Sequence, residues 1–151
     1  MDRLLFISDL HLAAERPDTS AAFFAFLGDE ARRASALYVL GDLFEYWVGD
    51  DMLALPFEAR CAQALRAATR RLPVHVLRGN RDFLLGERFF AETGCQDLAD
   101  PTVLRAGWGA SLLVTHGDAL CIGDTAYQQF RAQVRQPAWQ AALLARPLEE
   151  R

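Results

Sequence analysis

The sequence contains no lysine and no strongly basic segment. Its 16 basic residues are arginines scattered along the chain, and 20 acidic residues bring the net charge to −4. Surfaces that bind nucleic acids need clustered positive charge to displace counterions from the phosphates. We therefore expect no nucleic-acid partner.

Long apolar runs and paired cysteines are also missing. No stretch approaches the ~20 apolar residues that span a bilayer, and the first residues mix charged with apolar side chains, unlike a secretory signal. The cysteines, Cys61, Cys95 and Cys121, are odd in number and form no metal-like pair. We expect free thiols in a reducing compartment, packed as small buried hydrophobic side chains.

The sequence does have short apolar runs that alternate with stretches of helical periodicity. Its 151 residues, 52% of them hydrophobic, suffice for one domain with a buried core. Such alternation is typical of α/β folds. Pro56 suits the first turn of a helix, Thr19 or Ser20 is a candidate N-cap, and Gly94 is a candidate helix terminator. The predicted strands are 3–8, 36–40 and 73–77, and the predicted helices are 19–34, 57–71 and 83–92.

The second half of the chain has a different pattern. Two apolar runs flank residues 106–109, where glycines supply the positive φ of a tight turn, and this predicts a β-hairpin. From residue 124 onward the pattern is helical, with breaks at Pro137 and Pro147.

Side chains that can bind metal ions follow four of the predicted strands. Asp9 and His11 follow the first strand, Asp42 the second, Asn80 the third and His116 the hairpin. Ligands of open α/β sheets bind beyond the carboxyl ends of the strands, so these side chains are expected to share one cleft. Taken singly, each has a plainer explanation, because Asp and Asn cap turns and a histidine can lie satisfied in a core. Their joint occurrence favours a metal site.

The mixture of donor atoms indicates which cations would bind. Carboxylate and amide oxygens with imidazole nitrogens suit Mn²⁺, Fe²⁺ or Zn²⁺, and Mn²⁺ is our first expectation. One central carboxylate, for which Asp42 is the natural candidate, can bridge two metal ions ~3.5–4 Å apart, a spacing that serves in-line phosphoryl transfer. Two divalent cations are therefore the predicted cofactors, and no Ser, Cys or His nucleophile is needed.

The order of these motifs resembles the calcineurin-like metallophosphoesterase family. The motifs are Asp-x-His, Gly-Asp, Gly-Asn-x-Asp and a later His. The resemblance implies an α/β fold, a β-sandwich flanked by helices. The ligand sets it implies are Asp9, His11 and Asp42 for one metal ion, and Asp42, Asn80 and His116 for the other. The family also has a C-terminal Gly-His-x-His pair that this sequence lacks, so each metal site is expected to be one ligand short and the sandwich to lack its C-terminal strands.

Three longer motifs resemble a subgroup of that family that acts on a nucleotide-linked lipid. They are GDLFEYWVGDD (41–51), GNRD (79–82) and HGDALCIGDTAYQQFR (116–131). The subgroup hydrolyses UDP-2,3-diacylglucosamine to UMP and 2,3-diacylglucosamine 1-phosphate in the lipid A pathway. The resemblance implies a core at 1–123 and the start of a helical cap at 124–151, with Asp124 both a substrate contact and an N-cap. The acylated substrate implies a cytoplasmic protein in peripheral contact with the inner membrane, without an obligate protein partner.

Arg81 favours a pyrophosphate substrate on chemical grounds. Much of the family has His at this position of Gly-Asn-x-Asp, where it can protonate an alkoxide leaving group. An arginine cannot give up a proton at working pH, but its guanidinium can hold phosphate oxygens, and a phosphate leaving group needs no proton. Arg81 and Asp82 are predicted to be catalytic, and Asn80, Arg81 and Asp124 to bind substrate. The alternative is that Arg81 merely pairs with Asp82 or another acid.

Two other functions are compatible with the same residues. One keeps the metal chemistry but acts on another nucleotide pyrophosphate. The other is a non-catalytic scaffold that uses the fold for protein contacts. Scaffolds of that kind tend to lose ligands at the strand ends, whereas all five positions here keep an acid, an amide or an imidazole.

Overall fold

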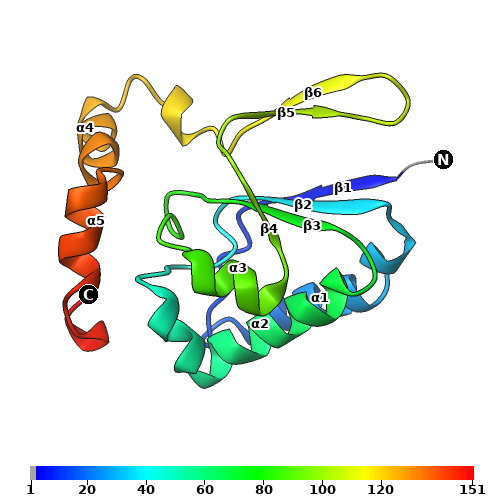
Figure 1. Ribbon diagram of the computed structural model, residues 1–151, viewed down its shortest axis with the longest axis horizontal. Coiled ribbons are helices and arrows are strands. Elements are labelled where there is room, and N and C mark those ends of the chain that lie inside the picture. Colours follow the sequence, from blue (N-terminus) through cyan, green and yellow to red (C-terminus); the bar gives the residue numbers. More distant parts are fainter. Residues whose placement is uncertain (1–2) are drawn as a thin grey trace.

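The computed structural model describes residues 3–151, and a parallel β-sheet lies at its centre (Figure 1). The strand order in space follows the order in the chain. All three neighbouring pairs are parallel. The predicted α/β fold and its first three strands are confirmed. The strands are β1 (Leu4–Ile7), β2 (Ala36–Leu40), β3 (Val74–Leu77) and β4 (Gln96–Leu98).

Three helices connect successive strands and cover one face of the sheet (Figure 1). Crossovers between parallel strands are right-handed, so connections that all step the same way across the sheet place their helices on the same side. The opposite face is therefore left for other parts of the chain. The helices are α1 (Pro17–Gly28), α2 (Pro56–Thr69) and α3 (Glu87–Thr93).

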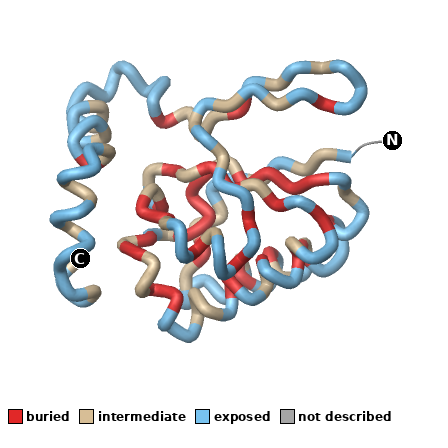
Figure 2. The backbone as a smooth tube through the Cα atoms, viewed as in Figure 1, coloured by how far each residue is buried: buried red, intermediate tan, exposed pale blue. Residues whose placement is uncertain are grey.

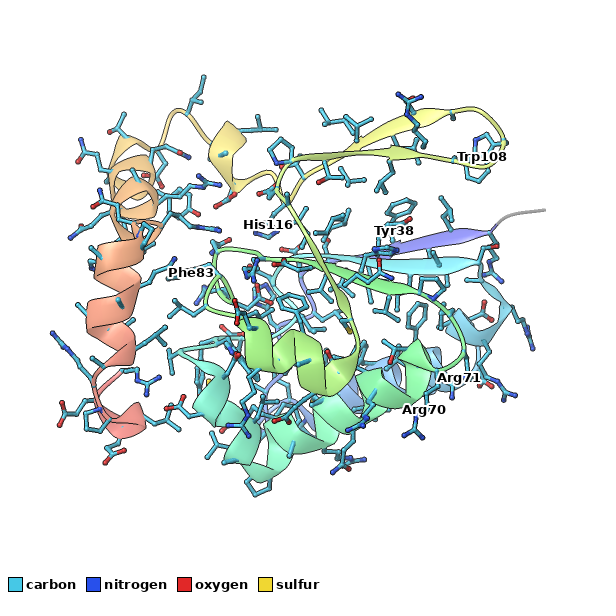
Figure 3. All side chains as sticks on the ribbon, viewed as in Figure 1. Tyr38, Arg70, Arg71, Phe83, Trp108 and His116 are labelled. Carbon is cyan, nitrogen blue, oxygen red and sulfur yellow. The ribbon has the colours of Figure 1, made fainter. Side chains whose placement is uncertain are left out.

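The side chains of successive residues in each strand point to opposite faces of the sheet. Leu37 and Val39 of β2 belong to the buried core under the helices. Tyr38, between them, lies on the other face (Figure 3). Its ring stacks on Phe6 of β1 at 5.1 Å between centroids and on His75 of β3 at 4.6 Å. Register explains this row, because the three residues are directly paired across the sheet.

A β-hairpin lies across the sheet from the helices, where the predicted sandwich has its second layer (Figure 1). Its strands β5 (Thr102–Arg105) and β6 (Ser111–Val114) are antiparallel. Gly109 has φ +89° in the turn, so the predicted hairpin is confirmed. Much of its surface is exposed (Figure 2), including the side chains of Val103 and Leu113.

Two further helices stand beside the sheet, away from α1–α3 (Figure 1). They are α4 (Thr125–Val134) and α5 (Pro137–Leu144). Asp124 caps α4, since its Oδ1 accepts a hydrogen bond of 2.9 Å from the Tyr127 N–H, as predicted. The division into a core and a cap at residue 124 stays a prediction. Within residues 3–151, no helix combines the length and apolar character required to cross a membrane.

Two helices start away from their predicted positions. The α1 helix begins at Pro17, whose fixed φ suits the first helical position, and neither Thr19 nor Ser20 caps it. The Ser20 hydroxyl instead donates to the Arg16 carbonyl at 3.0 Å. The α3 helix begins only at Glu87, and Gly94 ends it with φ +73°, as predicted.

The cysteines are free, as predicted, but only two are buried. Burial raises the pKa of the Cys61 thiol to about 12 and that of Cys95 to about 11, so both stay protonated and inert. Cys121 is exposed on the segment before α4, and the prediction that it packs as a buried side chain is wrong.

Candidate metal centre

The loops after β1 and β2 are joined by backbone hydrogen bonds. The Asp9 N–H donates to the Gly41 carbonyl at 3.1 Å, and the His11 N–H donates to the Asp42 carbonyl at 3.0 Å. Asp9, His11 and Asp42 have φ of 56°, 49° and 52°, and they are the non-glycine residues with positive φ in the described chain. Left-handed backbone is costly for such residues and concentrates at functional sites. The strain falls on three of the predicted metal ligands.

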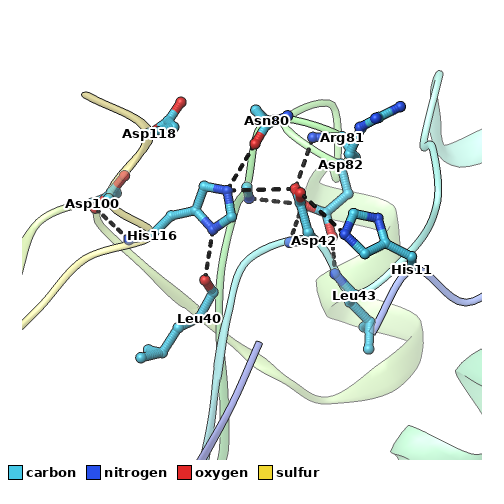
Figure 4. Close-up of polar contacts among 12 residues, drawn as sticks. His11, Leu40, Asp42, Leu43, Asn80, Arg81, Asp82, Asp100, His116 and Asp118 are labelled. Carbon is cyan, nitrogen blue, oxygen red and sulfur yellow. Dashed lines mark hydrogen bonds and ion pairs between the residues drawn. The ribbon is translucent and has the colours of Figure 1, made fainter. Parts of the chain in front are cut away.

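The predicted ligands come together at the carboxyl ends of the strands, where Figure 4 shows His11, Asp42, Asn80 and His116. One ligand atom each from Asp9, Asp42 and His116 lie within 4.8 Å of one another. The Nε2 atom of His116 is 2.9 Å from Asn80 Oδ1 and 3.7 Å from Asp42 Oδ1. On the other side of Asp42, its Oδ2 is 3.8 Å from His11 Nε2. Asp42 therefore sits between the two imidazoles, as a bridging carboxylate would.

The orientation of His116 leaves a lone pair facing this cluster. Its Nδ1 is 2.9 Å from the Leu40 carbonyl oxygen, which can only accept, so Nδ1 carries the proton. In the neutral ring Nε2 is then an acceptor, and it faces the acceptor Oδ1 atoms of Asn80 and Asp42. Metal-bound histidines commonly hold their other ring nitrogen against a carbonyl in this way.

Asp42 is a buried carboxylate without a permanent positive partner. It is 3% exposed, and its Oδ1 accepts a hydrogen bond of 2.8 Å from the Arg81 backbone N–H. Among residues 3–151, its ion-pair contacts are with the imidazoles of His11 and His116. A buried charge needs pairing or a metal ion. The residues present thus fit the divalent cations that the sequence predicts.

Two glycines allow the loops to approach so closely. A Cβ at Gly41 would lie 2.5 Å from His116 Nδ1, and a Cβ at Gly79 would overlap Asp42 Oδ1. Gly41 also has φ +91°. Any side chain at either position would push a predicted ligand out of place.

Asp82 supports the cluster without facing it. Its side chain is fully buried, and its carboxylate accepts hydrogen bonds from the N–H groups of Gly79 (2.7 Å), Leu43 (2.7 Å) and Asp42 (3.3 Å). Burial raises the pKa of this carboxyl, and the N–H donors oppose that rise. Asp82 was predicted to be catalytic, but a group enclosed by backbone cannot touch a substrate. Its role is to fasten the Asp42 loop to the Asn80 loop.

Arg81 points away from Asp82 and toward solvent. Its side chain is 54% exposed, and its NH1 lies 3.5 Å from Glu45 Oε1. Arg81 therefore pairs with an acid, as the alternative interpretation expected, and that acid is Glu45. Because the pair is exposed and its atoms are 3.5 Å apart, the guanidinium remains available to a ligand.

Asp118 and Glu45 are polar residues near the site that the sequence did not single out. The Asp118 carboxylate accepts hydrogen bonds from the Tyr127 hydroxyl (2.6 Å) and from Arg131 Nε (2.8 Å). Burial would raise the pKa of Asp118, but these donors hold it below its usual value. The sequence could have indicated these two residues only through their closeness to predicted ligands. Asp118 lies two positions after His116, and Glu45 lies three positions after Asp42.

An open cleft of about 420 Å³ adjoins the cluster. Asp124, the predicted substrate contact, lines the same cavity as three of the predicted metal ligands. The lining residues are Asp9, Asn80, His116, Gly117, Asp118, Cys121, Asp124 and Tyr127.

The sequence model of the calcineurin-like phosphoesterase family matches residues 2–142, most of the chain. The chain belongs to the calcineurin-like phosphoesterase family. The resemblance stated from the motifs is confirmed, and the ligand set predicted from that resemblance corresponds to the cluster at the strand ends. That these residues bind metal ions stays a prediction.

Relatives of this phosphoesterase chain include proteins named UDP-2,3-diacylglucosamine hydrolase. The protein of Chromobacterium violaceum is 53% identical over 146 residues, which are 97% of this chain and 61% of that protein. The protein of Aromatoleum aromaticum is 52% identical over 148 residues, 97% of this chain and 60% of its own length. The protein of Escherichia coli O81 is 49% identical over 145 residues, which are 95% of this chain and 60% of that protein. The chain thus spans about three fifths of the length of these relatives.

A solved structure supports the fold of the phosphoesterase chain. The crystal structure of Pseudomonas putida nuclease MPE superimposes with a TM-score of 0.50 and 25% sequence identity, covering 66% of this chain and 48% of that one.

Proposed function

We propose that this chain hydrolyses the pyrophosphate bond of UDP-2,3-diacylglucosamine, giving UMP and 2,3-diacylglucosamine 1-phosphate. The observation that carries the proposal is the convergence of Asp9, Asp42 and His116, whose ligand atoms lie within 4.8 Å of one another beside an exposed Arg81. Relatives named for this reaction, at about 50% identity over nearly the whole chain, support the choice of substrate. The activity is proposed for the chain as part of such an enzyme.

In the proposed reaction a water oxygen bonds to the α-phosphorus of the substrate, and the water gives up a proton to the solvent. The bond from that phosphorus to the bridging oxygen breaks, and the bridging oxygen leaves on the sugar phosphate. When bound, two divalent cations, with Mn²⁺ the first candidate, lower the pKa of water and stabilise charge on the attacking and leaving oxygens. Asp9, His11 and Asp42 would hold one cation, and Asp42, Asn80 and His116 the other.

Arg81 would hold the phosphate oxygens as negative charge develops in the transition state. Its guanidinium stays protonated and offers a planar fork of donors that matches phosphate geometry. The leaving phosphate departs without protonation, so an arginine serves where an alkoxide leaving group would need an acid. Asn80 and Asp124, which line the same cleft, would contact the substrate.

The proposal also includes a helical cap over the substrate and contact with a membrane surface. Asp124, which caps α4, and Tyr127 of α4 line the cleft, and α4 and α5 would form the start of a cap over the substrate. The acyl chains of the substrate would bring the protein into peripheral contact with the cytoplasmic face of the inner membrane. No obligate protein partner is proposed.

The test is Mn²⁺-dependent release of UMP from UDP-2,3-diacylglucosamine. It should be run on this chain and on a chimera that adds the part of the Chromobacterium violaceum relative that the chain does not match. We expect release from the chimera, and a loss of at least about 100-fold in Asp42→Asn, because an amide lacks the negative charge and the second oxygen with which Asp42 would bridge both cations. Glu30→Gln, which weakens only exposed ion pairs with Arg3 and Arg33, is the control.

Three outcomes would contradict the proposal in different ways. Failure to release UMP from this substrate, with hydrolysis of another nucleotide pyrophosphate, would replace the substrate and keep the chemistry. Binding of Mn²⁺ without hydrolysis of any pyrophosphate would favour the scaffold function. Undiminished activity of Asp42→Asn would remove the metal cluster from the mechanism.

A further inference from the structure

Among residues 3–151, Glu45 is the one acid in ion-pair contact with both a predicted metal ligand, His11, and the predicted phosphate-binding residue Arg81. Its Oε2 lies 3.6 Å from His11 Nδ1 and 3.6 Å from Arg16 NH1. Its Oε1 lies 3.5 Å from Arg81 NH1. Its side chain is 34% exposed, and its backbone N–H is fixed by a hydrogen bond of 3.1 Å to the Leu12 carbonyl.

The second observation is an unpartnered buried atom on His11. Its Nδ1 is buried and has no hydrogen-bond partner among residues 3–151. A buried polar atom left in this state costs about 1–3 kcal/mol. The nearest acceptor in an ion-pair contact with this nitrogen is Glu45 Oε2, and its distance is longer than the 2.7–3.2 Å typical of a hydrogen bond. A small rotation of the partly exposed Glu45 side chain closes the gap.

We propose that Glu45 is a positioning residue that accepts the Nδ1–H of His11 and holds Arg81 beside the same site. With the proton on Nδ1, the Nε2 lone pair of His11 faces Asp42, from which it is 3.8 Å away. His116 has the same arrangement, since its Nδ1–H is held by the Leu40 carbonyl. The two imidazoles thus receive their orientation from different acceptors, a backbone carbonyl and a carboxylate. The inference rests on the proposed metal site.

The two oxygens of Glu45 serve different partners, and a Gln substitution separates them. Glu45→Gln retains one oxygen, which should turn toward His11 and Arg16, because two donors lie on that side and only Arg81 on the other. The amide NH₂ then faces Arg81 and releases it. Glu45→Met keeps the length of the side chain but removes both acceptors.

The first test is the tautomer of His11 in the metal-free chain. The chain has only 3 histidines, so ¹⁵N-imidazole NMR at pH 8 can be assigned with His11→Gln. We expect an Nδ1–H signature for His11 in the wild type and in Glu45→Gln, and a shift toward the other tautomer in Glu45→Met. Glu30→Met, which removes an exposed ion pair with Arg3, should leave the spectrum unchanged.

The second test is Mn²⁺ affinity, measured by calorimetric titration of the same chains. Loss of an acceptor behind a metal-bound histidine weakens binding about 10–100-fold, so Glu45→Met should lose at least about 10-fold while Glu45→Gln stays within about twofold. Equal affinity and an unchanged His11 tautomer in Glu45→Met would overturn the inference while leaving the metal site intact. No Mn²⁺ binding by the wild type would overturn the metal site itself. If Glu45→Met does not fold, Glu45→Ala gives the same comparison.

The third test isolates the contact with Arg81 by a double-mutant cycle. Affinity for inorganic phosphate in the presence of Mn²⁺ is measured for Arg81→Met in the wild-type and Glu45→Gln backgrounds. We expect Arg81→Met to weaken phosphate binding by about threefold or more in the wild type, and by clearly less when Glu45 no longer orients the guanidinium. The same loss in both backgrounds would show that Glu45 does not position Arg81.

Discussion

Individual residues at the strand ends are held in backbone conformations that they would not adopt alone. Asp9, His11 and Asp42 all have positive φ, and each such residue costs about 1–3 kcal/mol unless its surroundings enforce it. These conformations are enforced by the backbone hydrogen bonds between the two loops and by the Asp82 carboxylate, which accepts from four N–H groups, those of Asp42, Leu43, Phe44 and Gly79. As a result of these backbone conformations, the predicted ligand side chains point into one cleft.

Gly79→Ala should disrupt the metal site through a single methyl group. A Cβ there would overlap Asp42 Oδ1, so the bridging carboxylate must move away from the imidazoles. We expect Mn²⁺ affinity to fall at least about 10-fold, in line with losses seen when a ligand is misoriented. Calorimetric titration measures the change. Gly28→Ala is the control, since nothing lies within 4 Å of its Cβ, and wild-type affinity in Gly79→Ala would contradict the argument.

The ligands were predictable at this scale, but their supports were not. Asp9, Asp42 and Asn80 follow the parallel strands β1, β2 and β3, whose carboxyl ends lie at one edge of the sheet. His116 follows β6 of the antiparallel hairpin. Asp82 follows a strand in the same way, yet its carboxylate turns inward to backbone groups about 40 residues earlier in the chain. Such side-chain contacts to distant backbone leave no periodic trace in a sequence, which is why the burial of Asp82 was not predicted and the position of Glu45 was overlooked.

At the scale of elements, α4 is attached to the sheet through one buried acid. Asp118 accepts hydrogen bonds from Tyr127 and Arg131 of this helix. Arg135, which follows the helix, lies 3.7 Å from Asp118 and donates to the Gly79 carbonyl at 3.0 Å. The attachment therefore reaches both the His116 loop and the Asn80 loop.

Asp118→Asn should loosen α4 while leaving the sheet folded. The substitution removes the charge that Arg131 and Arg135 face, and losing a hydrogen-bonded charged partner costs about 1–3 kcal/mol. Hydrogen exchange should accelerate in α4 relative to the strands. Glu92→Gln, which breaks only the exposed pair with Arg88 on α3, should leave α4 unchanged. Equal protection of α4 in Asp118→Asn and wild type would show that the helix is held by other contacts.

Elements with strong periodicity were predicted well, and elements fixed by distant contacts were not. The β2 strand and α2 matched closely because their apolar spacing is unambiguous. The α3 helix starts late because the Asp50 carboxylate accepts from the Gly86 and Phe89 N–H groups, an N-terminal cap supplied from another part of the chain. The β4 strand was missed because its three residues show no hydrophobic alternation.

The whole molecule is asymmetric about its sheet. One face is covered by three helices and carries the main core, while the other bears the Phe6, Tyr38 and His75 stack opposite the hairpin. His75 is a titratable group in this stack, and burial lowers its pKa below the ordinary value of 6.5. Protonation of this side chain is therefore linked to global unfolding.

This linkage predicts that stability falls as pH is lowered through the range below 6.5. The unfolded chain binds a proton at His75 more readily than the folded chain does, so the free energy of unfolding rises with pH there and is fully present above the unfolded pKa. His75→Phe retains the stacking on Tyr38 but removes the titration. Urea unfolding at pH 8, 7, 6 and 5 should show the wild type losing stability relative to His75→Phe only at the acidic end. Because every other side chain is common to both proteins, the contributions of the other groups cancel in the difference. A difference that stays constant with pH would mean that His75 has the same pKa in the folded and unfolded states.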